Sequence, residues 1–282
     1  LESYRATSNA DYWGHRKPHA AYWQQDVYHR IDAKLDEDTD ILTAKMQLNY
    51  RNNSPDTLNE LYFHLYQNAF TPDSYMDKMN QRRDYNRSFG KYEKQGLGTT
   101  VENVLVDGHI VKISIDNTLM KVVLQKPLLP NAELELNLDF KTFFERDGAW
   151  RRMKCWTHDG GVHYNGAHWY PRIVVYDTKF GWNLDQHFGH EFYGEFGTYD
   201  VTLDMPNNQI IGATGLLMNR NEMLPIELMT KLAIENFSSY SPQTSVIVPY
   251  ERGERKVWKY HAENVHDFAF IADPSFRIGH RQ

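Results

Sequence analysis

The sequence predicts a mainly β fold of antiparallel sheets, arranged as a saddle or a sandwich, with one short helix and long loops. Aromatic residues make up 14% of the 282 residues, and these residue types favour strands. Several segments alternate apolar and polar side chains with a period of two, as half-buried strands do. Strands do not alternate with helical segments of about 10–15 residues, which disfavours folds built from βαβ units.

The clearest strand pair lies between residues 27 and 50. Apolar side chains recur at spacings of two or four from Val27 to Leu35, and they alternate with polar ones from Leu42 to Tyr50. The acidic turn at 36–40 joins the two segments. This pattern predicts an antiparallel hairpin with one face buried.

Further strands are expected along the rest of the chain, and the dipeptide Asp107-Gly108 marks a tight hairpin. One amphipathic helix is expected at 225–236, behind Pro225. The polar stretch 67–100 predicts a long excursion, and loops of that length are usually functional or mobile. The other expected strands lie at 61–65, 104–106, 110–115, 120–124, 134–140, 200–205, 209–213, 246–248, 256–261 and 267–271.

Charge and hydropathy exclude several classes of protein. The net charge is −6 and the pI is near 6.1, so no basic surface is expected to attract nucleic acid. No apolar stretch reaches the roughly 20 residues that a transmembrane helix needs. Cys155 is the single cysteine, which rules out an internal disulfide.

The sequence contains no recognisable catalytic or metal-binding motif. A helical zinc site of the H-E-x-x-H type is absent, and the nearest string is His187-Phe188-Gly189-His190-Glu191. Its two histidines are three residues apart around a glycine, so we expect two loop histidines rather than a metal pair. We therefore predict no catalytic residue and no metal ligand in this chain.

The segment from Gly160 to Arg172 is chemically the richest. It combines glycines, aromatic residues, an amide and two histidines, which suits a surface that grips a small polar ligand. A glycine-rich turn whose aromatic residues complete the core is an equally good interpretation. A carbohydrate-binding sandwich also stays open, because exposed aromatic residues on sheets stack on sugars.

The string Trp169-Tyr170-Pro171-Arg172 and its continuation Val175-Tyr176-Asp177 resemble the N-terminal domain of aminopeptidase N-like zinc metallopeptidases, the gluzincin aminopeptidases, in particular a subgroup from Bacteroidetes. The resemblance extends over about 22–276. Its other pieces follow in the family's order at 22–27, 52–58, 61–69, 191–201, 212–215 and 265–273.

The resemblance implies a non-catalytic β domain at 22–276 that packs on a C-terminal catalytic domain. Residues 1–21 would be a leader, wrapped on the surface or disordered, and 277–282 would begin the linker. The zinc and the H-E-x-x-H motif would belong to the catalytic domain of the full-length parent, so no cofactor is expected here. By the same resemblance, we expect an exported protein in the periplasm or at the cell surface.

In this family, the β domain contributes an amide or a carboxylate that helps hold the amino group of the peptide substrate. The matching segment is about 162–168, and the family's usual Gln is missing from it. Asn165 is therefore the expected substrate-binding residue, with His168 as the second candidate, because an amide oxygen can accept a hydrogen bond from an ammonium group. Two alternatives are a stand-alone module that binds glycans or peptides, and an inactive peptidase-like scaffold.

Overall fold

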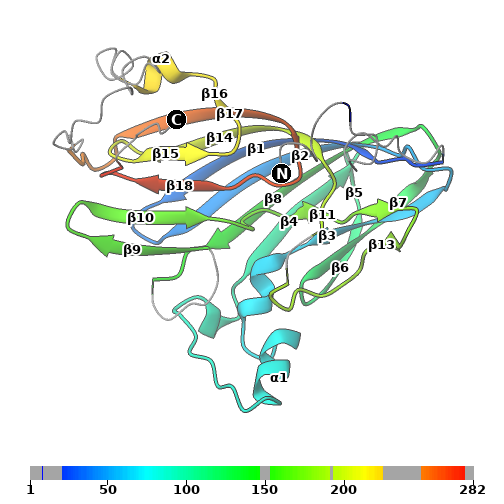
Figure 1. Cartoon of the computed structure of the whole chain (residues 1–282), viewed down its shortest axis with the longest axis horizontal. Helices are drawn as coiled ribbons and strands as arrows, with labels where there is room; N and C mark the ends of the chain where they lie inside the picture. Colours follow the sequence, from blue (N-terminus) through cyan, green and yellow to red (C-terminus); the bar gives the residue numbers. More distant parts are fainter. Residues whose placement is uncertain (1–7, 9–20, 147–152, 191–192, 225–248, 277–282) are drawn as a thin grey trace.

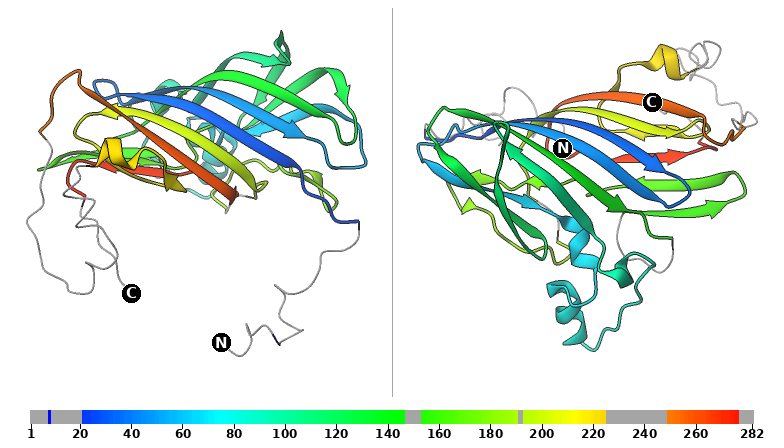
Figure 2. Two further views of the ribbon diagram at one scale, coloured as in Figure 1. Left: turned by 90° about the horizontal axis from the view of Figure 1, so that it is seen from above. Right: turned by 180° about the vertical axis from the view of Figure 1, so that it is seen from behind.

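The computed structural model describes residues 8, 21–146, 153–190, 193–224 and 249–276. One large, twisted sheet forms the back of the molecule, and two four-stranded sheets lie side by side against its inner face (Figures 1 and 2). The prediction of a mainly β fold is confirmed. In the order of the sheet, the eight strands of the large sheet are β16 (Leu216–Leu217), β17 (Arg255–Val265), β14 (Gly197–Pro206), β1 (Asp26–Asp36), β2 (Ile41–Arg51), β8 (Glu133–Phe143), β4 (Thr99–Val106) and β5 (His109–Ile110).

The two smaller sheets are named here after one strand each. The β10 sheet consists of β15 (Ile210–Ala213), β18 (Phe270–Asp273), β10 (Gly161–Gly166) and β9 (Lys154–His158). The β3 sheet consists of β11 (Arg172–Ile173), β3 (Leu58–His64), β7 (Leu119–Leu128) and β6 (Lys112–Asp116). A separate hairpin pairs β12 (Tyr176–Asp177) with β13 (Gly181–Trp182).

The expected hairpin between residues 27 and 50 is present as β1 and β2. Buried and exposed side chains alternate along both strands, and Ile31 stands opposite Met46 in an antiparallel register. On its other side, β1 pairs with β14 in parallel, with Ile31 opposite Val201. This pair departs from the antiparallel pattern, because β14 comes from a distant part of the chain and not from a hairpin neighbour.

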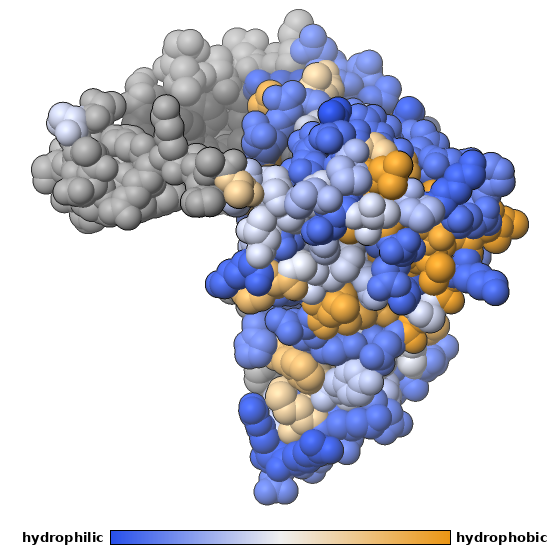
Figure 3. Space-filling model, turned by 90° about the vertical axis from the view of Figure 1, so that its right-hand side faces the viewer, coloured by the Kyte–Doolittle hydropathy of each residue, from blue (hydrophilic) through white to orange (hydrophobic). Residues whose placement is uncertain are grey.

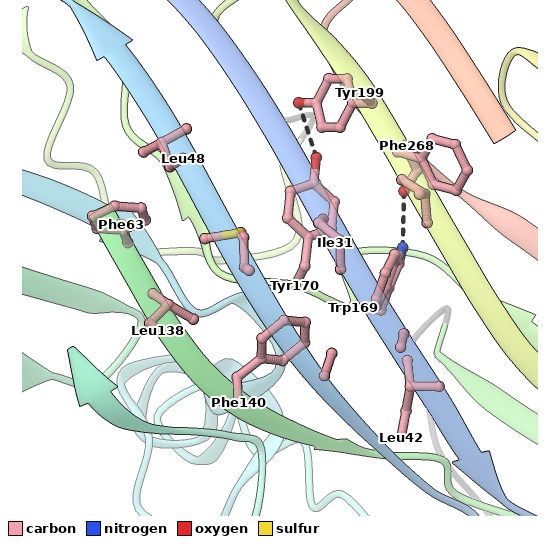
Figure 4. Close-up of a cluster of buried hydrophobic side chains, with 14 of the residues drawn as sticks. Ile31, Leu42, Leu48, Phe63, Leu138, Phe140, Trp169, Tyr170, Tyr199 and Phe268 are labelled. Atoms are coloured by element: carbon pink, nitrogen blue, oxygen red, sulfur yellow. Dashed lines mark hydrogen bonds between the residues drawn. The ribbon is translucent and has the colours of Figure 1, made fainter. Parts of the chain in front are cut away.

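The core lies between the large sheet and the two smaller ones (Figure 4). Trp169 and Tyr170 enter it from the turn between β10 and β11, and both are fully buried. Trp169 Nε1 donates to the Phe268 carbonyl at 2.9 Å, and the Tyr170 hydroxyl donates to the Tyr199 hydroxyl at 3.1 Å. Aromatic side chains with a polar tip are buried at little cost when the tip finds such a partner.

The strand expected at 110–115 is divided between two sheets. Asp107-Gly108 makes the expected tight turn, and β5 pairs with β4 in the large sheet. The chain then passes through the buried Val111, whose N–H donates to the Val104 carbonyl at 3.2 Å, and continues as β6 of the β3 sheet. The apolar pattern was therefore correct, but it spans a crossing between sheets.

The long polar excursion at 67–100 is more ordered than its composition suggests. It contains the 3-10 helices η2 (Tyr66–Phe70) and η3 (Glu93–Gln95) and the helix α1 (Tyr75–Gln81). Glu145 Oε1, at the end of β8, accepts the backbone N–H groups of Tyr92 at 2.5 Å and Glu93 at 2.7 Å. Arg87 and Glu93 form an ion pair at 3.4 Å with both side chains buried.

Some expectations fall outside the described residues. These are the leader at 1–21, apart from residues 8 and 21, the helix at 225–236, the strand at 246–248, and the linker at 277–282. The short helix α2 (Arg220–Met223) lies just before the position of the expected helix. No helix in the described part of the chain is long and apolar enough to cross a membrane.

Candidate functional site

Strand β10 occupies the glycine-rich segment that sequence analysis left open between a ligand surface and a core turn. Its side chains alternate between the core and the surface. Tyr164 faces inward, is buried, and donates to Asp40 Oδ1 at 2.9 Å. Asn165 faces outward and is half-buried, with Lys154 opposite it on β9 and Ile271 opposite it on β18. The expected site residue therefore lies in the middle of the sheet's outer face.

The outer face of the β10 sheet is partly apolar. Trp156 lies opposite His163 in the register of β9 and β10, and their rings stack with centroids 4.1 Å apart and planes at 23°. Trp156 and Ile271 are each 41% exposed. Hereafter, "the outer face of the β10 sheet" means the surface formed by Lys154, Trp156, His158, His163, Asn165, Ile271 and Asp273.

Asp273 organises the polar end of this face. Its Oδ2 lies 3.1 Å from His158 Nε2 and 2.9 Å from His163 Nδ1, and its Oδ1 accepts both the N–H and the hydroxyl of Ser275 at 2.7 Å. Burial alone would raise the pKa of Asp273, but hydrogen bonds from Ser275 and His163 outweigh it and hold the pKa below its ordinary value.

His168 lies in a different environment from Asn165. It has a positive φ of 55°, and its carbonyl accepts Gln67 Nε2 at 2.8 Å. Its ring is buried, 4.8 Å from the ring of Tyr66 and 5.8 Å from that of His187. His64 stacks on Tyr66 at 4.9 Å. We call these four side chains, His64, Tyr66, His168 and His187, the Tyr66 cluster.

Burial in the Tyr66 cluster keeps His64 neutral. Burial lowers the pKa of His64 to about 3, and the nearby charges of Arg172 and His187 act in the same direction. Sequence analysis expected His187 and His190 to be loop histidines, and His190 is exposed. It missed the contact between His187 and His168, because no local spacing connects residues that meet only through the fold.

Two pieces of the family resemblance meet at Arg172. This buried arginine follows Pro171 and donates to the His266 carbonyl, and Gly194 packs directly on its guanidinium group. The next residue, Glu195, is 5% exposed and accepts the Tyr176 N–H at 3.3 Å. Burial raises the pKa of Glu195 to about 8.

No group of three or more His, Cys, Asp or Glu side chains among the described residues is arranged to hold a metal ion. Two histidines and a carboxylate do meet at Asp273. However, the Gly160 N–H donates to His158 Nδ1 at 3.0 Å, which leaves the proton of the neutral ring on Nε2, where a metal would bind. The residues that the structure describes therefore do not fit a zinc ion.

Cys155 does not offer a nucleophile either. The thiol is fully buried and free of any disulfide. Burial, followed by the negative charge of Asp40, raises its pKa to about 12. A thiol in that state is unreactive, because the thiolate is the nucleophilic form.

Solved structures of M1 zinc metallopeptidases show a weak similarity to this chain. No protein-family model matches the chain, and no curated protein matches it. The chain is similar to an M1 zinc metallopeptidase from Deinococcus radiodurans, with 13% identity and a TM-score of 0.45 over 90% of this chain and 42% of that one. A two-domain M1 mutant bound to L-tryptophan matches with 14% identity and a TM-score of 0.46, over 89% and 43% of the two chains. The chain thus spans less than half the length of these structures.

Proposed function

We propose that this chain is the non-catalytic N-terminal domain of a zinc-dependent aminopeptidase. In this proposal, the outer face of the β10 sheet packs against the catalytic domain, and Asn165 helps to hold the amino group of the peptide substrate. The observation that carries the proposal is the position of Asn165, half-buried on a sheet face between Lys154 and Ile271. The sequence resemblance assigns a substrate-holding amide to this same segment.

Apolar side chains exposed around Asn165 support a contact between this face and the catalytic domain. Trp156 and Ile271 expose apolar atoms on either side of β10, and clustered apolar surface on a sheet commonly marks a contact with another protein surface. Asn165 has a neutral side chain, and its amide oxygen can accept a hydrogen bond from the ammonium group of a substrate.

The second candidate residue, His168, takes a supporting role in this proposal. Its ring packs in the Tyr66 cluster and its carbonyl accepts Gln67, so it holds the turn that follows β10. The zinc would sit in the catalytic domain, where it would polarise the scissile carbonyl and activate water. An exported location, in the periplasm or at the cell surface, completes the proposal.

The first experiment uses the protein expressed from the full reading frame. Asn165→Ala is expected to raise KM for aminoacyl-p-nitroanilides by about tenfold, because one charge-assisted hydrogen bond is worth roughly 1.5 kcal/mol, and to leave the zinc content unchanged. Asn137→Ala is the matched control, since Asn137 is also a half-buried asparagine on a strand, in the large sheet. Equal KM values for the two variants would contradict the role of Asn165.

A stand-alone binding module is the second candidate function, and the exposed ring of Trp156 favours it. Sugars stack on such rings, so this function predicts that soluble polysaccharides retard the chain in affinity gels and that Trp156→Ala abolishes the retardation. A third possibility is an inactive peptidase-like scaffold. Zinc analysis of the full-length protein distinguishes this scaffold from the aminopeptidase domain and from the stand-alone binding module. A full-length protein without zinc and without peptidase activity would support the scaffold.

A further inference from the structure

Strand β6 is an edge strand of the β3 sheet, with β7 as its neighbour on one side. The two strands form a tight hairpin in which Asp116 stands opposite Leu119 and Asn117 has a positive φ of 52°. In a hairpin with a two-residue loop, the residues that flank the loop form a hydrogen-bonded pair, and such pairs alternate along the strands. Lys112, Ser114 and Asp116 therefore direct their main-chain groups towards β7.

The main-chain groups of Ile113 and Ile115 consequently point away from β7, towards the free edge. No strand in the described part of the chain pairs with that edge. An edge of this kind is a template for another strand. Side chains alternate as well, so Lys112 and Asp116 share one face while the two isoleucines share the other.

The sequence of β6, Lys-Ile-Ser-Ile-Asp, is complementary to itself when read in the opposite direction. In an antiparallel pair of two copies centred on Ser114, Lys112 stands opposite Asp116 of the second copy. Ile113 then stands opposite Ile115 of the second copy, and these are the residues whose main-chain groups face outward. In this register, each Lys112 can pair with Asp116 of the other copy. The main chains of Ile113 and Ile115 can exchange hydrogen bonds in the same register.

Apolar side chains are exposed near this edge on both faces of the β3 sheet. Ile110 and Ile115 are 78% and 47% exposed, and Val123 of β7, which stands opposite Lys112, is exposed on the other face from Ile115. Figure 3 views the side on which β6 and β7 lie in Figure 1 and shows apolar atoms gathered there among polar ones. Lys112 and Asp116 are exposed. Asp116 Oδ1 accepts the Tyr75 hydroxyl at 2.8 Å and Oδ2 accepts Gln186 Nε2 at 3.4 Å, and each carboxylate oxygen can accept a further hydrogen bond from a lysine.

We propose that two copies of this chain associate through β6, joining their β3 sheets into one continuous antiparallel sheet across a two-fold axis. Charges on an edge strand normally prevent pairing. Here the charges of Lys112 and Asp116 disfavour pairing with unrelated strands and pairing in shifted registers. They favour the antiparallel register centred on Ser114. The contact is short, so the dimer is weak and concentration-dependent, as interfaces that bury less than about 1,200 Å² are.

Sedimentation velocity over a concentration series to about 1 mM tests the proposal, because a weak dimer is populated in that range. The unmodified chain is expected to sediment faster as its concentration rises. Lys112→Asp places two carboxylates opposite each other and is expected to weaken association at least tenfold. The double variant Lys112→Asp/Asp116→Lys restores both ion pairs and is expected to restore association. Lys126→Asp, an equal charge change at an exposed position of β7, leaves association unchanged.

A second variant tests the main-chain hydrogen bonds. Ile115→Pro removes an N–H that points to the free edge and keeps the ladder between β6 and β7, since proline is tolerated on the outer side of edge strands. It is expected to abolish association while the circular dichroism spectrum stays unchanged. A chain that remains monomeric over the whole series would overturn the proposal, as would a dimer that persists in both folded Lys112→Asp and Ile115→Pro variants.

Discussion

Arg146 and Asp40, 106 residues apart in sequence, form a two-pronged ion pair: Nε lies 2.6 Å from Oδ2, and Nη2 lies 2.8 Å from Oδ1. The hydroxyl of Tyr164 donates to the same carboxylate at 2.9 Å. The turn between β1 and β2 is thereby tied both to the chain that follows β8 and to β10. The acidic turn predicted at 36–40 is present, and Asp40 is its buried member.

Asp40→Asn is expected to destabilise the fold by about 2 kcal/mol, because it removes the negative charge that pairs with Arg146 and replaces one of the two acceptor oxygens shared by Arg146 and Tyr164 with an NH2 donor. Asparagine tolerates the positive φ of 60° at this position, so backbone strain does not confuse the result. Urea unfolding measures the change. The control is Asp38→Asn, which loses only an exposed pair with Arg252 and should unfold like the parent chain.

Gly194→Ala is expected to be among the most damaging single-methyl substitutions in the chain. A Cβ at this position would overlap Nη2 of the buried Arg172, and overpacking of this kind costs about 3 kcal/mol or more. Thermal unfolding gives the measurement. Gly212→Ala is the matched comparison, because the added methyl group would meet Ile271 at an ordinary 3.5 Å. Similar melting temperatures for both variants would show that Arg172 yields easily.

Glu195 is expected to make the fold less stable as the pH rises. An unfolded glutamate loses its proton near pH 4.5, whereas burial keeps folded Glu195 protonated up to about pH 8. The unfolded state therefore binds fewer protons between these values, and stability falls across that window. Glu195→Gln removes this loss, so we expect the variant to gain roughly 2–4 kcal/mol over the parent between pH 5 and pH 8.5.

Urea unfolding at these two pH values measures the effect. Glu135→Gln, on an exposed position of β8, serves as the control and should not alter the pH profile of the parent. A parallel profile for Glu195→Gln and the parent would show that Glu195 ionises normally in the fold.

His29 is expected to make the fold less stable as the pH falls, which is the opposite of the pH dependence expected from Glu195. Both of its ring nitrogens are buried and have no hydrogen-bond partner among the described residues, and the ring lies flat on Tyr199 at 4.4 Å. Burial, reinforced by the charge of Arg172, lowers its pKa to about 3. An unfolded histidine binds a proton near pH 6.5, so stability falls as the pH drops from 6.5 towards 3.

His29→Phe keeps the stacked ring and removes the titration. We expect equal or greater stability at pH 7 and a clear gain over the parent at pH 4, measured by thermal unfolding. His109→Phe is the comparison, because His109 lies on an exposed strand. A variant that loses as much stability as the parent between pH 7 and pH 4 would contradict the assignment to His29.

Local periodicity predicted the long strands because each carries its own evidence. β1, β2 and β8 alternate buried and exposed residues over their length. The short strands β9 and β10 were missed as strands, since glycines and histidines interrupt any period. Strand β10 takes its place in the sheet by pairing with β18, which lies more than a hundred residues further along, and β9 pairs with β10.

At the candidate site, too, the sequence supplied the candidate residues and the tertiary structure decided where their side chains lie. Asn165 was chosen from the resemblance, and the structure adds that it faces outward between Lys154 and Ile271. His168 was chosen on the same grounds, and it packs into the Tyr66 cluster instead of facing outward with Asn165. Only two residues lie between them in the sequence, and His168 has a positive φ at the turn that follows β10.

By itself, the sequence determined where the long strands lie and which of their faces is apolar, because the alternation of side chains is a property of neighbouring residues. Only the tertiary structure decided which strands lie side by side, where Arg146 meets Asp40, and which histidines surround Tyr66. Those contacts join residues distant in the chain, and their energies depend on burial and geometry that arise only once the sheets have packed together.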